Sequence, residues 1–177
     1  MSHKYKTHGG GRYFVTLTVV GWIDLFTRAE YADLLLECLA HCIRHKGLRI
    51  YEYVIMPSHV HLLADLVEDN KPLAGLLRDV KSYAAKRLYE LIESHPQESR
   101  RGWLVYQLGY FGQPHGQLFK IWQEGSHPIE LRDAAQTRRC QQYIRQNPVA
   151  ARLVTDASAY LFSSACPDQP LPLAELL

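Results

Sequence analysis

The sequence predicts an α+β domain: a ferredoxin-like, RRM-like antiparallel sheet with helices packed on one face. Three observations predict this fold class. The predicted elements follow the order strand–helix–strand–strand–helix, apolar residues recur at helical spacing between and after the strands, and a short turn-forming segment separates the second and third strands. At 177 residues the chain has the length of one domain. Residues 1–177 are therefore expected to form a single unit with an irregular, proline-rich tail from about residue 155.

Three early segments have the composition of strands. Residues 12–21 (RYFVTLTVVG) are rich in aromatic and β-branched side chains. Residues 49–56 (RIYEYVIM) and 59–67 (HVHLLADLV) follow, separated by Pro57 and Ser58. Because proline and serine favour turns, the second and third strands are predicted to form a hairpin.

The first helix is predicted between the first two strands. Thr27 and Glu30 have the spacing of a capping box, and apolar residues then recur at helical intervals. Lys46 and Gly47 are typical of a helix C-terminus. These residues predict a helix that starts at Thr27 and ends at Gly47.

Two further helices are predicted, over residues 72–94 and 128–147, the latter stopped by Pro148. Between them the apolar periodicity fails, and glycine, proline and glutamine accumulate over residues 95–116. This stretch is predicted to be a long loop with one short strand near residues 103–108.

Composition narrows the class of protein. No apolar run reaches the roughly 18 residues of a membrane span, and the polar N-terminus lacks the apolar stretch of a signal peptide. The four cysteines form no CxxC pair, which favours reduced thiols and a cytoplasmic protein. Residues 1–152 carry 20 basic against 15 acidic side chains. This balance fits a polyanionic partner, although an ordinary solvated surface explains it equally well.

His59 and His61 are separated by one residue on a predicted strand. Because side chains alternate along a strand, both imidazoles are expected to lie on the same face of the sheet. Two neutral imidazoles provide part of a metal-ligand set. The alternative is a pair of polar residues on the solvated face of an edge strand.

Tyr143 and Asn147 lie four residues apart in the last predicted helix and therefore share one side of it. A tyrosine phenol becomes a nucleophile when its phenolate is stabilised, and an asparagine carbonyl can complete a metal site. The alternative for Tyr143 is a packing role, since the chain holds eleven tyrosines.

The two motifs together resemble the single-tyrosine HUH transposases, and most nearly their REP-associated branch. The resemblance rests on YVIMPSHVHLLADL and, about eighty residues later, YIRQNPVAARLV, within a similarity that covers about residues 12–165. It implies that Tyr143 is the nucleophile and that His59, His61 and Asn147 hold Mg²⁺ or Mn²⁺. It also implies cleavage and rejoining of single-stranded or hairpin DNA through a 5′-phosphotyrosine intermediate.

The resemblance further implies a homodimer associated with the nucleoid, in which the partner can supply the nucleophile helix. Tyr143 is then expected far from His59 of its own chain. Two positions depart from the family pattern: Ser58 stands where asparagine is usual, and QEGSHPIEL follows Trp122 in place of a Tyr/His-His-Asp stretch.

Basic residues around these motifs are candidate phosphate contacts: Lys81, Arg145, Arg12 and Arg138. His115 and His127 are reserve metal ligands. Two other functions remain open, a non-catalytic module that binds single-stranded nucleic acid and a metal-dependent phosphodiesterase that uses water. A relative that retains only a regulatory role is a third possibility. Only the transposase function requires Tyr143, both histidines and Asn147 together.

Overall fold

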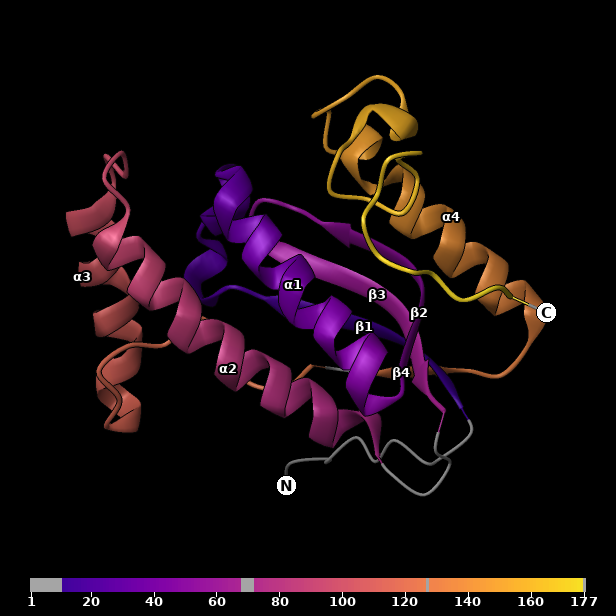
Figure 1. Cartoon of the computed structure of the whole chain (residues 1–177), viewed down its shortest axis with the longest axis horizontal. Helices are drawn as coiled ribbons and strands as arrows, with labels where there is room; N and C mark the ends of the chain where they lie inside the picture. The colour runs from indigo at the N-terminus through magenta and orange to yellow at the C-terminus, as the bar shows by residue number, and fades with distance from the viewer. Residues whose placement is uncertain (1–10, 68–71, 127, 177) are drawn as a thin grey trace.

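The computed structural model describes residues 11–67, 72–126 and 128–176. Its centre is an antiparallel sheet in the order β2-β3-β1-β4 (Figure 1). The strands are β1 (Arg12–Thr18), β2 (Leu48–Ile55), β3 (His59–Leu66) and β4 (Ile129–Leu131). Each pair of neighbouring strands is antiparallel, and the predicted hairpin of β2 and β3 is present. The predicted α+β fold class is confirmed.

Two long helices cover one face of the sheet, α1 (Ala29–Lys46) and α2 (Leu73–Ser94). Alternate side chains of the strands, such as Val15 and Leu62, pack with Leu35 of α1 and Leu77 of α2 in the main core. These four side chains are fully buried. The burial of apolar surface between helices and sheet stabilises this half of the molecule.

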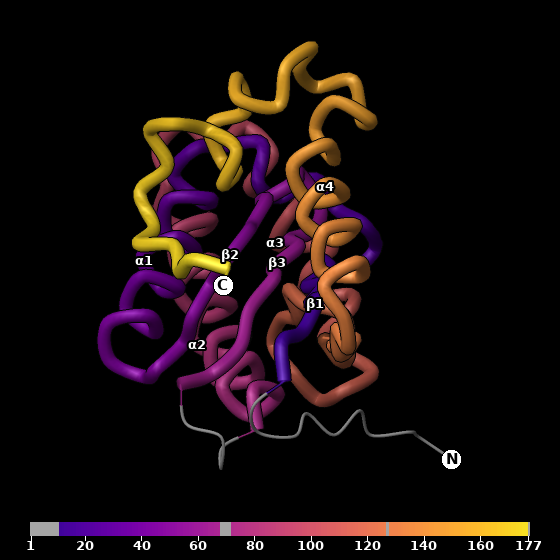
Figure 2. The backbone as a smooth tube through the Cα atoms, turned by 90° about the vertical axis from the view of Figure 1, so that its right-hand side faces the viewer, coloured from indigo at the N-terminus to yellow at the C-terminus, as the bar shows by residue number. Residues whose placement is uncertain are grey.

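The opposite face of the sheet carries α4 (Ala134–Ala150), so the three predicted helices do not all share one face (Figure 2). A second, smaller cluster forms there, in which Ile144 of α4 packs with Val54 and Leu63 of the sheet. The β2–β3 register shifts between Ile50 and Glu52, as in a β-bulge. The candidate site lies on this α4 face.

Residues 95–116 differ from the prediction of a loop with a strand at 103–108. They contain α3 (Arg101–Gly112), which buries Leu104, Leu108 and Gly112 at four-residue intervals. Exposed aromatic residues on the other side of this helix hide its periodicity, because the apolar residues do not form a single stripe.

The predicted bounds of two helices were wrong. Residues 129–131 form β4, and α4 begins after Asp133, whose carboxylate accepts a hydrogen bond from the Gln136 N–H at 2.7 Å. Pro148 does not stop α4, because it stands in the last turn, where few backbone bonds remain to be lost. The Thr27 capping box is absent: Arg28 occupies the N-cap position without a side-chain hydrogen bond. Gly47 ends α1 in the left-handed conformation, as predicted.

The segment after α4 returns along the outer edge of β2. The Ile55 N–H donates to the Phe162 carbonyl at 2.8 Å, and the Ala174 N–H donates to the Ile50 carbonyl at 2.8 Å. Ser163 forms an antiparallel bridge with Val54. The tail therefore satisfies backbone groups of β2 that an open sheet edge would leave to solvent. None of the helices described is both long and apolar enough to cross a membrane.

Candidate active site

The histidine pair lies on β3, an interior strand, and not on the solvated edge that was the alternative. His59 is paired with Thr18 and His61 with Thr16 of β1. Strand alternation places both imidazoles on the α4 face, as predicted, with their ring centroids 4.8 Å apart. His61 is buried, with 5% of its surface exposed.

Burial lowers the pKa of both imidazoles. Burial, reinforced by the neighbouring His59, lowers the pKa of His61 to about 3. Burial also lowers the pKa of His59, against an opposing effect of Asp24. A neutral imidazole has a nitrogen lone pair to offer to a metal or to a proton.

A hydroxyl group stands beside the Nδ1 atom of each histidine. Thr16 Oγ1 lies 2.9 Å from Nδ1 of His61, and Ser58 Oγ lies 3.2 Å from Nδ1 of His59. When each Nδ1 donates its proton to the hydroxyl, the lone pair resides on Nε2. Ser58, at the position where the family usually has asparagine, thus retains a polar contact with the first histidine.

Tyr143 of α4 lies in the site of its own chain. Its hydroxyl is 3.4 Å from Nε2 of His61, and its ring meets the Phe14 ring edge-on at 5.8 Å. Phe14 in turn stacks on His61 at 5.1 Å. The expectation that Tyr143 would lie far from His59 of its own chain was wrong, because the Tyr143 ring lies 5.2 Å from the His61 ring, which is 4.8 Å from the His59 ring. With 51% of its surface exposed, Tyr143 is also accessible to a large substrate.

Asn147 lies one turn beyond Tyr143 and is half-buried. Among the residues described, no three His, Cys, Asp or Glu side chains are grouped so that they could hold a metal ion. A metal at the histidine pair therefore needs a ligand of another type, and the Asn147 amide carbonyl has the required chemistry.

Arg145, a predicted phosphate contact, forms an ion pair with a carboxylate of the sheet. Its guanidinium bonds both carboxylate oxygens of Glu52, with Nη2 2.8 Å from Oε1 and Nε 3.0 Å from Oε2. Gln141 Nε2 donates to the same carboxylate at 3.2 Å, and the Ser164 hydroxyl donates to it as well. We call Glu52, Gln141, Arg145 and Ser164 the Glu52 cluster. Sequence reasoning missed Glu52 because a single glutamate in a strand gives no sign of the partner that it meets.

Of the other basic candidates, two are engaged within the chain. Lys81 Nζ donates to the carbonyls of Gln123 at 2.8 Å and Gly125 at 2.6 Å, and burial lowers its pKa to about 8. The Arg12 guanidinium lies over the Tyr51 ring, 5.2 Å from its centroid. Arg138 is exposed on α4.

Of the two reserve ligands, only His115 lies within the described residues, and its ring contacts Lys120 and Glu124. His115 lies in the short 3-10 helix that follows α3, where its Nε2 is 2.7 Å from Lys120 Nζ and its Nδ1 is 3.5 Å from a Glu124 carboxylate oxygen. His127 lies outside the described residues.

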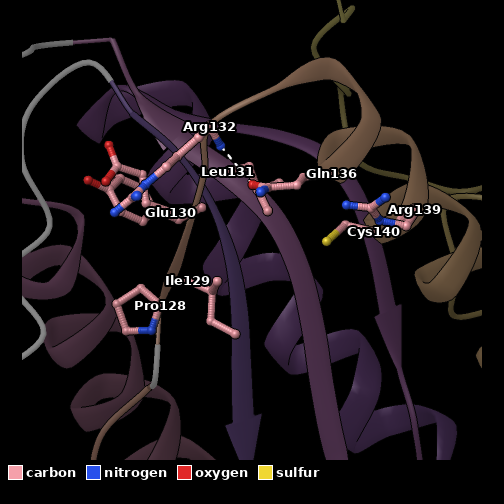
Figure 3. A pocket seen from close by; sticks show the side chains of 9 residues that line it. Pro128, Ile129, Glu130, Leu131, Arg132, Gln136, Arg139 and Cys140 are labelled. Carbon is pink, nitrogen blue, oxygen red and sulfur yellow. Dashed lines mark hydrogen bonds between the residues drawn. The ribbon is translucent and has the colours of Figure 1, made fainter.

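A separate groove of about 600 Å³ runs between β4 and the first half of α4 (Figure 3). Arg132 and Arg139 line it together with Glu130, Gln136 and Cys140. Its lining includes neither Tyr143 nor the histidine pair. The groove adds basic surface beside the candidate site but does not contain the reactive groups.

The family model described as "Transposase IS200 like" matches residues 23–147. An uncharacterized protein of Haemophilus influenzae is 22% identical over 156 residues, which cover 82% of this chain and 84% of that protein.

The fold is also similar to solved structures. A REP-associated tyrosine transposase bound to a REP hairpin superposes with a TM-score of 0.65 at 20% identity, covering 99% of this chain and 92% of the other. A putative transposase from Deinococcus radiodurans gives a TM-score of 0.46 at 21% identity, covering 81% of this chain and 92% of the other. The first match shows a shared fold, and the family match spans the histidine pair, Tyr143 and Asn147. The resemblance noted in the sequence is confirmed, and the chain belongs to the IS200-like transposase family.

Proposed function

We propose that this protein is a metal-dependent DNA strand transferase that cleaves and rejoins single-stranded or hairpin DNA through a 5′-phosphotyrosine at Tyr143. The observation that carries the proposal is the accessible Tyr143 hydroxyl, 3.4 Å from Nε2 of the neutral His61. The similar transposase of known structure is bound to a REP hairpin, which supports hairpin DNA as the substrate class.

The metal, Mg²⁺ or Mn²⁺, is proposed to bind Nε2 of His59, Nε2 of His61 and the amide oxygen of Asn147. The fit rests on two imidazoles on one face of the sheet, with ring centroids 4.8 Å apart and each Nδ1 atom beside a hydroxyl. When bound, such an ion supplies positive charge that polarises a phosphate oxygen. Thr16 and Ser58 act as positioning residues, because they fix which nitrogen of each ring carries the lone pair.

The proposed reaction exchanges one phosphate ester for another. The Tyr143 oxygen attacks the phosphorus, the bond from phosphorus to the 3′ oxygen breaks, and the phenol proton is balanced by the proton gained at the new 3′-hydroxyl. The ester bond to Tyr143 conserves the phosphodiester linkage, so a second 3′-hydroxyl can displace the tyrosine and rejoin the strand. Alignment in the first step depends on the position of α4, which the Glu52 cluster holds against the sheet.

The test is incubation of the protein with end-labelled hairpin DNAs and Mg²⁺ or Mn²⁺, followed by denaturing gels. The wild-type protein should form a covalent adduct, and Tyr143→Phe should form none while binding DNA about as well, because only one oxygen is removed. Tyr106→Phe is the matched control, since Tyr106 is an exposed tyrosine of α3. Free DNA ends without adduct from Tyr143→Phe would establish the water-dependent phosphodiesterase instead. Binding without cleavage by the wild-type protein would establish the non-catalytic module.

We also propose that the protein is a homodimer associated with the nucleoid in the cytoplasm. The support is the family membership, and light scattering of the purified protein measures the oligomeric state directly. Because Tyr143 already lies beside His61 of its own chain, dimerisation is not needed to bring these two side chains together.

A further inference from the structure

Trp22 is an exposed aromatic residue at the rim of the candidate site. Its ring lies edge-to-face with the His59 ring, with 5.6 Å between centroids, and 60% of its surface is exposed. The buried Trp122, by contrast, packs against Phe26 in the core. The position of Trp22 therefore contributes little to packing, and the core does not explain why a large aromatic side chain stands there.

The backbone at Trp22 adopts a conformation that side chains rarely take. Trp22 has a φ of 55°, directly after Gly21 with a φ of 61°. A β-carbon at Gly21 would lie 2.7 Å from the Phe111 ring of α3, so the turn fits closely against that helix. A left-handed conformation at a bulky residue costs free energy and persists only where the surroundings fix it.

The loop that carries Trp22 is anchored to the residues just before the histidine pair. The Val19 N–H donates to the Ser58 carbonyl at 2.9 Å, and the Phe26 N–H donates to the Pro57 carbonyl at 2.8 Å. These two bonds flank Trp22 and tie its loop to the start of β3. The backbone of the loop is thus held in place before any ligand binds, with the indole in contact with the His59 ring, which lowers the conformational entropy lost on binding.

We propose that Trp22 is a stacking platform for an unpaired nucleobase next to the cleaved phosphate. This rests on the proposed function, because the reacting phosphate would lie at His59, His61 and Tyr143, and the adjoining base would then meet the indole. An aromatic face accepts any base, so Trp22 contributes affinity for unpaired nucleotides and not sequence selectivity. A base held in a duplex is stacked on its neighbours and cannot use the platform.

The test uses the Tyr143→Phe protein, so that binding is measured without cleavage. The probe is oligo(dT) carrying 5-iododeoxyuridine, alone or as a duplex with oligo(dA), and photocrosslinks are located by mass spectrometry. Crosslinking to Trp22 should occur with the single strand and not with the duplex. Introducing Trp22→Ala into the Tyr143→Phe protein should weaken its binding of the single strand roughly 5- to 100-fold. Trp22→Phe in the same protein should retain most of the affinity. Folding should be preserved, because the Trp22 side chain is exposed and alanine adopts the left-handed backbone conformation at a cost similar to that of tryptophan. Circular dichroism checks the fold.

The matched control is Tyr106→Ala, which removes an exposed aromatic ring from α3 and should change binding less than about twofold. Equal binding by the Trp22→Ala and Tyr106→Ala proteins, crosslinks only at Trp103 or Tyr106, or no single-strand binding at all would overturn the proposal. If binding by the Tyr143→Phe protein depends on Trp22 while the wild-type protein, with Tyr143 intact, forms no covalent adduct, the platform is supported and the strand-transferase function is refuted. If the wild-type protein forms the adduct but binding does not depend on Trp22, the strand-transferase function is supported and the platform is refuted.

Discussion

Arg145→Met should destabilise the protein strongly, although Arg145 lies near the surface. The substitution keeps an unbranched side chain on α4 but leaves the Glu52 carboxylate, 2% exposed, with only its neutral partners Gln141 and Ser164. Removing one partner of a buried ion pair costs about 3–5 kcal/mol. Because 51% of the Arg145 side chain is exposed, solvent already screens the pair, and we expect a loss of about 2–3 kcal/mol. For a chain of this size that corresponds to a fall in Tm of roughly 5–10 °C.

Urea unfolding of four variants tests this value. Glu52→Gln should cost less than Arg145→Met, about 1 kcal/mol, because the freed guanidinium can turn to water while the amide keeps some hydrogen bonds. The double variant should lose less unfolding free energy than the two single variants together, since it has no unpaired Glu52 carboxylate. Arg138→Met, on the same helix but exposed, is the control and should change stability by under about 0.5 kcal/mol. Equal stability of the Arg145→Met and Arg138→Met proteins would refute the reasoning.

Two further predictions concern other buried contacts. Thr16→Val removes the hydroxyl beside Nδ1 of His61. Calorimetry should show Mn²⁺ binding weakened about 10- to 100-fold. An unchanged Mn²⁺ affinity would contradict the positioning role of Thr16. Burial acts to raise the pKa of Glu98, but hydrogen bonds from the Arg100 N–H, the Tyr31 hydroxyl and the Arg100 guanidinium outweigh it and lower the pKa to about 2. The ionised form therefore stabilises the fold above pH 4.5, and this contribution is lost as the pH falls toward 2. The difference in unfolding free energy between wild type and Glu98→Gln should shrink over that range, and a constant difference from pH 7 to pH 3 would contradict it.

Local periodicity was sufficient to predict which candidate side chains share a face. The one-residue spacing of His59 and His61 fixes their common face once the segment is a strand, whatever its neighbours are. The four-residue spacing of Tyr143 and Asn147 likewise places both on one side of a helix once the segment is helical. The proximity of the two motifs, about eighty residues apart, came from the resemblance to a family and not from either pattern.

Contacts between distant segments could not be predicted in this way. Thr16 meets His61 across 45 residues because β1 pairs with β3, and Arg145 meets Glu52 across 93 residues because α4 crosses β2. Neither partner has a local signal, since a threonine is ordinary in a strand and a lone glutamate in one looks like an exposed position. The sequence shows that Arg145 is a basic residue close to Tyr143, which favoured a DNA contact. It does not show that the Glu52 carboxylate lies next to Arg145 in the fold.

The mode of attachment differs between the helices of the two faces, and this bears on the position of Tyr143. Eight residues of α1 are buried against the sheet and α2, whereas α4 buries only Thr137, Ile144 and Pro148. Apolar contact therefore holds α1 firmly and α4 weakly, and the Glu52 cluster supplies much of what fixes α4 in place. An ion pair has a defined direction, which apolar contact lacks, so it also sets the rotation of the helix about its axis. Because Tyr143 lies two residues before Arg145, the charge pair that attaches the helix also aims the phenol at His61.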